Sequence, residues 1–311
     1  RDLSVKDPSK SKHSHYGYTS SLLINLSMFT RDPEILSFAE ELMELSMERM
    51  TDRDYGWLFG YPAAESRDWK YVPTFVDGKE IISAGAQLTA ALSFLRLYEL
   101  TGKEMYRERG VALGDQVRRF AWDSDSGGWH DLIERASPHS LVGPRNVSWW
   151  IQCYGDFLQL HLYIITRNRK YLDDFQKMAV FWNDHFIDRK NGGVFQTVSP
   201  DGSPVEMNKA MPWKAAYHEM EHGLLNYIYL KLYVEKQPIK LYFRLGETKA
   251  NTKHFVSLIE DPSVQIASVK INGRPWTAFD VRERSVLLPE GKNLTLEVCL
   301  APGSRDIPSG R

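Results

Sequence analysis

The chain has 311 residues, of which 39 are basic and 40 acidic, so its formal net charge is -1, and 42% of its residues are hydrophobic. This length suggests two domains, and the apolar content suffices for a large core. Because the charges are balanced and interspersed and no apolar run approaches the roughly 18 residues of a membrane span, we expect neither nucleic acid nor a membrane as a partner.

Apolar residues recur at helical spacing through most of the chain. We expect helices near residues 15–30, 33–50, 80–101, 103–121, 146–166, 168–186 and 213–235. These stretches follow one another as pairs. The sequence therefore predicts a mainly α fold in this part of the chain.

Three of the helix pairs end in a similar turn that is rich in Asp and Gly. The turns cover residues 52–57, 123–129 and 188–195. Asp and Asn suit the exit of a helix, Gly adopts positive φ, and the apolar residue that follows starts a short hairpin. The result is an internal repeat of roughly 65 to 70 residues.

One helix pair cannot bury its apolar face alone, so repeated pairs must stack or close into a ring. We expect residues 1–236 to form the C-terminal portion of an (α/α)6-type barrel or toroid, incomplete because only about four helix pairs are visible. An incomplete ring should expose apolar surface at its N-terminal edge. An open helical-repeat scaffold is the alternative.

The pattern changes to alternation with a period of two after residue 238, which indicates strands. We expect them near residues 240–244, 255–259, 264–271, 286–288 and 294–298, with a tight turn at Asn272-Gly273. Residues 237–303 are therefore predicted to form a small antiparallel β domain, similar to the sandwich-like accessory domains of many carbohydrate-active barrels.

The residues most suggestive of chemistry lie in the segment 211–222. On a helix, Lys214, His218 and His222 would form one polar stripe, with Glu221 three residues after His218. Polar groups at the N-terminal end of an apolar helix can project into the mouth of a barrel. We predict His218 and Glu221 as catalytic residues; a buried, hydrogen-bonded structural histidine is the alternative.

Residues 218–222 also spell His-Glu-x-x-His, the pattern of zinc proteases. The pattern fits poorly because Glu221 adds a charge between Glu219 and His222, and no matching third ligand follows. We therefore predict no metal site, and zinc bound by both imidazoles would overturn that prediction.

A family resemblance rests on the order and spacing of several motifs. They are Trp149-Trp150-Ile-Gln152, Tyr171-Leu172-Asp173, residues 188–195, Asp201-Gly202 and Pro212-Trp213-Lys214-Ala-Ala-Tyr217-His218. This pattern resembles N-acylglucosamine 2-epimerases and cellobiose 2-epimerases over about residues 14–235, and leaves the β domain unexplained. The resemblance implies an (α/α)6 barrel, with His218 as a general acid/base and Trp149 and Trp150 lining a sugar site.

The chain also departs from that family. Where the resemblance implies a second catalytic His and a Glu, this sequence has Ala86 and Thr89, and neither side chain can act as a base. Glu221 occupies a position where an Arg is usual. The candidate replacement bases are polar residues elsewhere in the chain: His13, His15, Glu65, Asp68 and His161.

The first functional hypothesis is a carbohydrate epimerase or isomerase that abstracts the proton at C2 of a sugar. A glycoside hydrolase or lyase of an α/α-barrel class, or a non-catalytic sugar-binding scaffold, are the alternatives. No organic cofactor is expected, and the partner is a mono- or oligosaccharide. The predicted substrate-binding residues are Trp149, Trp150, Gln152, Trp213, Lys214, Tyr217, Trp57 and Trp69.

Compartment and assembly stay open. The sequence starts at Arg1 without Met, which we interpret as a fragment or a processed product. Cys153 and Cys299 lie in different predicted domains, so no disulfide framework is expected. We leave the localisation unknown, with the cytoplasm slightly favoured, and include a homodimer among the expected assemblies.

Overall fold

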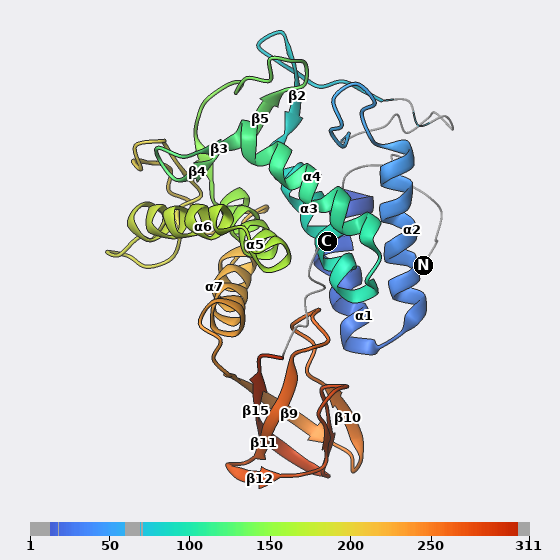
Figure 1. The fold of residues 1–311 in the computed structure, drawn as a ribbon. Helices are drawn as coiled ribbons and strands as arrows, with labels where there is room; N and C mark the ends of the chain where they lie inside the picture. Colours follow the sequence, from blue (N-terminus) through green and yellow to red (C-terminus); the bar gives the residue numbers. More distant parts are fainter. Residues whose placement is uncertain (1–12, 18, 60–68, 70, 304–311) are drawn as a thin grey trace, which may run out of the picture.

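The computed structural model describes residues 13–17, 19–59, 69 and 71–303, and combines helices with antiparallel strands (Figure 1). The helical elements are η1 His13–Gly17, η2 Thr19–Leu23, α1 Ile24–Thr30, α2 Pro33–Arg49, α3 Ala84–Thr101, α4 Glu104–Ala121, α5 Trp149–Thr166, α6 Arg169–Phe181, η3 Trp182–Phe186, α7 Tyr217–Tyr229 and η4 Leu230–Val234. Short strands connect them: β1 Phe75–Val76, β2 Lys79–Ser83, β3 Trp122–Asp123, β4 Gly128–Trp129, β5 Leu132–Glu134, β6 Val147–Ser148, β7 Thr197–Val198 and β8 Pro204–Glu206.

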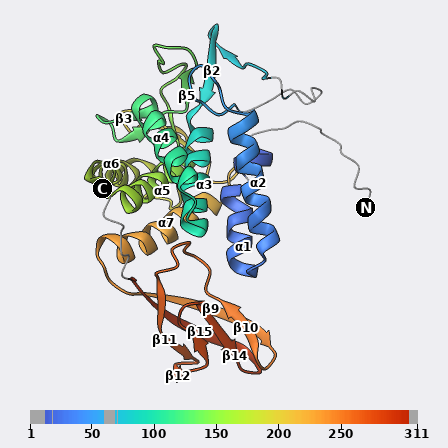
Figure 2. The same cartoon turned by 45° about the vertical axis from the view of Figure 1, so that its right-hand side comes forward.

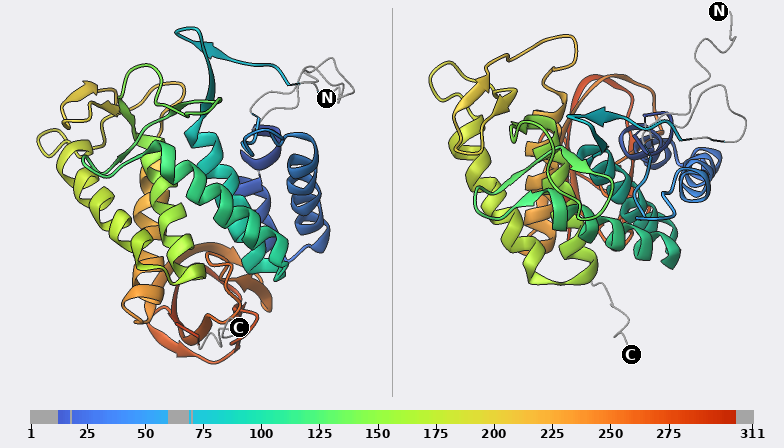
Figure 3. Two further views of the ribbon diagram at one scale, coloured as in Figure 1. Left: turned by 45° about the horizontal axis from the view of Figure 1, so that its top comes forward. Right: turned by 90° about the horizontal axis from the view of Figure 1, so that it is seen from above.

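The helices pack as consecutive pairs. α1 packs on α2, α3 on α4 and α5 on α6, while α3 and α5 also contact each other and α5 contacts α7. Figure 3 shows the pairs following one another in chain order when the molecule is viewed from above. α3 and α5 are buried along almost their whole length, whereas α4 and α6 are amphipathic. The apolar periodicity of these segments therefore reflects an inner and an outer layer.

Three predicted helices begin later than expected. Strand β2 occupies 79–83 before α3, with Ser83 accepting the Ala86 N–H as N-cap (3.4 Å), and β6 precedes α5. The segment 211–214 forms a turn in which Met211 and Lys214 bridge each other, so α7 starts at Tyr217 rather than at 213. Lys214 is therefore not on the same helical stripe as His218 and His222.

The internal repeat is confirmed in atomic detail. In each turn one Asp side chain accepts two backbone N–H groups, and a Gly with positive φ donates its N–H to the carbonyl of that Asp. The Asp and Gly pairs are Asp52 with Gly56, Asp123 with Gly127, and Asp188 with Gly192. Each turn leads into a short antiparallel pairing, as predicted.

Two of these hairpins are each joined to the following helix by a buried glutamine, which was not predicted from the sequence. Gln87 on α3 accepts the Leu58 N–H (2.9 Å) and donates to the Leu58 carbonyl (2.8 Å). Gln152 on α5 does the same with the Trp129 N–H (2.8 Å) and carbonyl (2.9 Å). Both amides replace a missing strand partner for a buried peptide unit.

The C-terminal region is antiparallel β structure, as predicted. One sheet has the order β12-β11-β15-β9 and another β10-β14-β13. The strands are β9 Ile239–Thr248, β10 Thr252–Phe255, β11 Gln265–Ile271, β12 Arg274–Trp276, β13 Phe279–Asp280, β14 Ser285–Leu288 and β15 Gly291–Ala301. Asn272 and Gly273 both adopt positive φ between β11 and β12, which confirms the tight turn.

One predicted strand is misplaced. Residues 256–259 are not extended partners of a sheet; they begin a loop, 256–264, between β10 and β11. Val256 and Ile259 are buried in the apolar cluster that the helix ends share with the strands, although neither residue belongs to a strand.

The sheets lie at the end of the helical layer where α7 finishes (Figure 2). Leu160 and Ile164 of α5 and Ile228 and Leu232 near the end of α7 share one apolar cluster with the strands. The β structure is thus packed onto the C-terminal ends of the inner helices.

Large apolar side chains are exposed at both edges of the helical layer. On the N-terminal side they are Leu22, Leu26, Phe29 and Phe38, as expected for an incomplete ring. On the other side they lie along α7 and are Met220, Leu224 and Tyr227. The second edge was not predicted. No helix within the described residues is long and apolar enough to cross a membrane.

Candidate functional site

The most distinctive arrangement surrounds His218 in the first turn of α7. Its imidazole is enclosed by aromatic rings: Trp149 at 6.0 Å, Trp150 at 6.5 Å, Tyr154 at 5.6 Å and Tyr217 at 5.0 Å between centroids. Three of these rings come from the first two turns of α5, which contacts α7. We call this set, with His218, the aromatic cluster.

The surroundings of His218 shift the pKa of its imidazole. Burial lowers the pKa of His218 below its ordinary value, the Lys214 cation lowers it further, and Glu219 opposes both effects. His218 Nδ1 is buried and has no hydrogen-bond partner in the described structure. A neutral imidazole with an uncommitted nitrogen is chemically suited to accept a proton.

The position of the Trp150 ring depends on a glycine. A Cβ on Gly85 at the start of α3 would lie 2.3 Å from the Trp150 ring. The absent side chain lets the indole lie directly on the α3 backbone.

Glu221 lies one turn after His218 and is partly buried. It accepts a hydrogen bond from the Tyr217 hydroxyl (3.2 Å) and lines a cavity of about 10 Å³ together with Arg96, Tyr154 and His161. Burial raises the pKa of Glu221, while the Arg96 cation opposes that rise. Glu221 therefore holds its proton to higher pH than an exposed glutamate does.

Lys214 is buried and forms an ion pair with Glu219. Its ammonium also lies 5.3 Å from the centroid of the Trp149 ring. Lys214 therefore packs its ammonium against the Trp149 indole and places a positive charge near His218. It reaches the aromatic cluster from the turn before α7, not from the helical stripe that was predicted.

The second histidine of the His-Glu-x-x-His pattern is committed elsewhere. His222 Nε2 lies 2.5 Å from the buried Asp156 carboxylate of α5, and the His222 ring packs against Trp182 at 4.6 Å. Glu219 pairs with Lys214. The described residues hold no group of three or more metal-ligating side chains arranged to bind an ion.

Several predicted binding residues do not join the aromatic cluster. Trp57 has no exposed surface and packs against Phe120 and His139, so it offers no face to a ligand. Gln152 spends its amide on the Trp129 backbone. We therefore assign Trp57 and Gln152 structural roles in the hairpins of the repeat instead of the predicted ligand-binding roles.

Two predicted tryptophans lie away from His218. Trp213 is 84% exposed in the turn before α7, so its ring does not converge on the cluster. Trp69 packs edge-on against His15, with centroids 5.5 Å apart. This contact forms a separate aromatic pair at the first helical segment.

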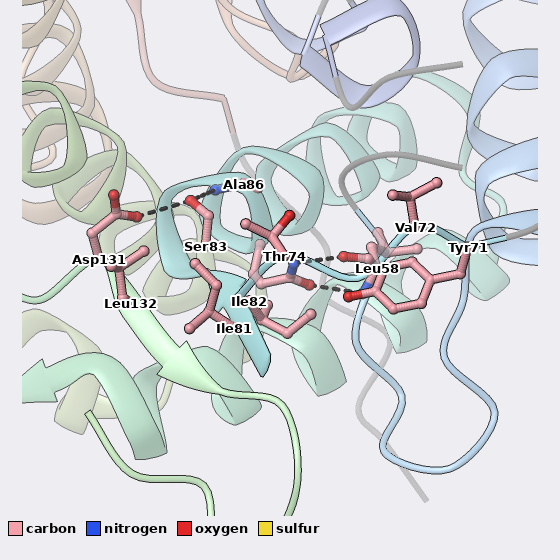
Figure 4. A pocket seen from close by; sticks show the side chains of 11 residues that line it. Leu58, Tyr71, Val72, Thr74, Ile81, Ile82, Ser83, Ala86, Asp131 and Leu132 are labelled. Atoms are coloured by element: carbon pink, nitrogen blue, oxygen red, sulfur yellow. Dashed lines mark hydrogen bonds between the residues drawn. The ribbon is translucent and has the colours of Figure 1, made fainter. Parts of the chain in front are cut away.

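A pocket of about 230 Å³ lies at the N-terminus of α3 (Figure 4). Ala86 lines it, together with Tyr71, Thr74 and Asp131. Asp131 accepts the Ser83 hydroxyl hydrogen bond at 2.8 Å. The small side chain at Ala86 thus leaves open space where the family resemblance implies a histidine.

Thr89, which stands where the resemblance implies a glutamate, donates its hydroxyl to the Gly85 carbonyl (2.8 Å). Among the candidate replacement bases, His161 places Nδ1 2.8 Å from the Phe157 carbonyl and lines the same cavity as Glu221. His15 packs on Trp69 as described above. Glu65 and Asp68 lie outside the described residues, and of His13 only the backbone is described.

Sequence reasoning missed Tyr154, Arg96 and Asp156. Tyr154 lies one turn after Trp150, so helical spacing gave a usable signal. Arg96 and Asp156 are charges inside strongly apolar helices, a pattern that predicts a buried partner but not its identity.

Among known proteins, those similar to this chain are solved structures. No family model and no curated protein matches this chain. Solved structures do match over about 70% of the chain, and they show an α/α fold that this chain shares with two sugar epimerases and a sugar isomerase.

Three of these structures have TM-scores near 0.6. A D-mannose isomerase matches with a TM-score of 0.61 at 19% identity, over 74% of this chain and 58% of its own. A sugar epimerase from a ruminal bacterium gives 0.59 at 15%, over 70% and 53%. The cellobiose 2-epimerase of Bacillus thermoamylovorans gives 0.58 at 18%, over 69% and 52%. The chain thus spans a little over half the length of these structures, and the similarity shows the fold alone.

Proposed function

We propose that this chain carries the acid-base part of a sugar isomerase or epimerase site, with His218 as the base that removes the proton at C2 of an open-chain sugar. The observation that carries this proposal is the place of His218 inside the aromatic cluster, where burial lowers the pKa of the imidazole and Nδ1 has no hydrogen-bond partner among the described residues. Trp150 and Tyr217 provide the aromatic faces on which the CH groups of a sugar stack, while the buried Trp149 packs between Lys214 and His218.

Glu221 is proposed as the second acid-base group. It follows His218 by three residues on α7, so both groups approach a ligand from the same side. An aldose-ketose isomerisation needs only one face: His218 takes the C2 proton and returns it to C1. A protonated Glu221 gives its proton to O1, and its carboxylate then takes the proton from O2.

This geometry favours isomerisation over epimerisation. Inversion at C2 needs a second base on the opposite face of the sugar. Ala86 and Thr89 supply none, because Ala86 has no proton-accepting group and the Thr89 hydroxyl is bonded to the Gly85 carbonyl. A ketose or aldose interconverted on one face is therefore the proposed substrate class.

The finer architecture belongs to the same proposal. We infer that the helical pairs are part of an (α/α)6 ring, since the matched part covers only 52% to 58% of those structures and both edges of the helical layer expose apolar side chains. Residues 1–236 would then be the catalytic-type domain, and residues 237–303 an accessory β domain.

The test follows deuterium. The protein is incubated in heavy water with D-mannose, D-glucose, D-fructose and cellobiose, and the products are read by NMR. We expect deuterium at C2 of the aldose and C1 of the ketose, and a loss of about 10² to 10⁴-fold in His218→Asn. His254→Asn, which changes a histidine of the β sheets, should keep the wild-type rate.

The other outcomes are informative. Deuterium at C2 with an inverted product would mean an epimerase with a second base elsewhere. Exchange that survives His218→Asn would remove this residue from the mechanism. Cleavage of cellobiose would indicate a glycoside hydrolase, and sugar binding without exchange would leave a non-catalytic scaffold.

A further inference from the structure

A loop of the β region reaches into the helical layer and carries two buried acids. In the segment 256–264, Glu260 and Asp261 are each only 2% exposed. The Tyr229 hydroxyl of α7 donates to Glu260 (2.8 Å), and the Tyr233 hydroxyl, one turn later, donates to Asp261 (3.0 Å). Arg284 donates to the Asp261 carbonyl (3.0 Å), which fixes the loop from the β side.

Glu260 forms an ion pair with Arg96 of α3, and both charges are buried. Arg96 also donates to the Asn25 side chain of α1 (2.6 Å). One guanidinium therefore connects the first helical pair, the second helical pair and the β region. A buried charge at such a junction needs a close partner, and Glu260 provides it.

Arg96 has a second neighbour. It lines the same cavity as Glu221, whose wall is completed by Tyr154 and His161 from α5 and by Tyr229 from α7. Among the described groups that face Glu221, Arg96 is the permanent cation. Its positive charge acts on Glu221, and Glu260 offsets that charge from the other side.

We propose that Glu260 is a positioning residue of the candidate site, supplied by the β region, which holds Arg96 at the cavity wall and sets how strongly its charge acts on Glu221. The relevance to catalysis rests on the proposed function, but the electrostatic coupling does not. The β region then contributes a residue that positions a charged group of the candidate site.

The two members of the pair should act in opposite directions. Glu260→Gln keeps the shape and a hydrogen-bond acceptor but leaves the Arg96 charge less compensated, so the pKa of Glu221 falls. Arg96→Met removes the cation and leaves the Glu260 anion, so the pKa of Glu221 rises. Arg96→Lys keeps the charge and should stay close to the wild type. A purely structural role gives no such reversal of sign.

The experiment is a carboxyl ¹³C NMR titration of protein labelled at the Glu side-chain carboxyl, with Glu221 assigned as the signal missing from Glu221→Gln. We expect shifts of about half a pH unit or more, downward in Glu260→Gln and upward in Arg96→Met. Glu283→Gln makes the same chemical change on the exposed side of the β region and should leave the Glu221 midpoint unchanged.

The proposal is overturned if Glu260→Gln and Arg96→Met leave the Glu221 midpoint at the wild-type value, or move it in the same direction. Should Glu260→Gln fail to fold, Arg96→Met is compared with the double variant Arg96→Met/Glu260→Gln, which removes both charges. The double variant must have the lower midpoint. Absence of sugar exchange in the wild type would reject the proposed function and leave this result standing.

Discussion

His218 shows how a residue acquires chemistry from its surroundings. Burial and the Lys214 ammonium disfavour the imidazolium and outweigh the opposing charge of Glu219, so the pKa of His218 lies below its ordinary value. The basic form of His218 is then available at neutral pH, and a proton-transfer rate that depends on it rises with pH and levels off once the pKa is passed.

The first prediction concerns that titration. The His218 ring proton signal, assigned by its absence from His218→Asn, should titrate with a midpoint below about 6.5. Lys214→Met removes a cation that lowers the pKa and leaves Glu219 unpaired, so the midpoint should rise. A wild-type midpoint at or above 6.5, or a fall in Lys214→Met, would contradict the electrostatic account.

Sequence reasoning identified individual residues unevenly. The predicted contact among four residues is present: Trp149, Trp150 and Tyr217 all lie against His218. Motif spacing on two helices was sufficient here, since it predicts which side chains share a face. Gln152 was assigned to a ligand because it belongs to the Trp149-Trp150-Ile-Gln152 motif of the family resemblance. Only the fold reveals that a backbone segment from the preceding hairpin satisfies its amide.

At the scale of elements, the paired amides explain how the repeat joins hairpin to helix. Gln87 and Gln152 occupy the fourth residue of α3 and α5, and each binds both polar groups of one peptide unit. The corresponding position of α7 is Met220, which is 71% exposed. α7 is therefore attached without a glutamine that binds a preceding hairpin.

The second prediction follows from the buried amides. Gln152→Leu leaves the Trp129 N–H and carbonyl without the partner they now have, so we expect a loss of about 2 to 4 kcal/mol in the free energy of unfolding. Urea denaturation measures it. Gln176→Leu, on the exposed face of α6, should change stability by less than about 0.5 kcal/mol. Equal effects in both variants would show that the amide is dispensable.

Element boundaries were predicted less well than element types. The periodicity located the helical regions, yet it ran through the residues that form β2 and β6 and through the turn at 211–214. Apolar letters there belong to short strands and turns that cover the helix ends. Long-range pairing decides their conformation, and local periodicity carries no information about it.

At the scale of the whole molecule, the described structure exposes large apolar side chains at two edges of the helical layer. Leu22, Leu26 and Phe29 lie at one edge and Met220 and Leu224 at the other. Apolar faces of this kind mark surfaces that other protein segments cover. The exposed apolar side chains at the N-terminal edge were predictable from the number of helix pairs, whereas the way in which the sheets pack onto the helix ends was not, because no motif reports that contact.

The third prediction is that the 311-residue chain self-associates through these edges. Sedimentation analysis should show mass above that of a monomer at micromolar concentration. Met220→Lys combined with Leu224→Lys should shift the population toward monomer without lowering the melting temperature by more than a few degrees. Lysines at Tyr242 and Leu287, which are exposed on the β sheets, serve as the matched control.

The loop that carries Glu260 also joins parts of the chain that lie far apart in the sequence. Its buried acids accept hydrogen bonds from Tyr229 and Tyr233, and Glu260 pairs with Arg96 of α3. Removal of residues 237–303 would take this carboxylate away from a buried guanidinium, so we expect the helical part of the chain to lose stability without the β region.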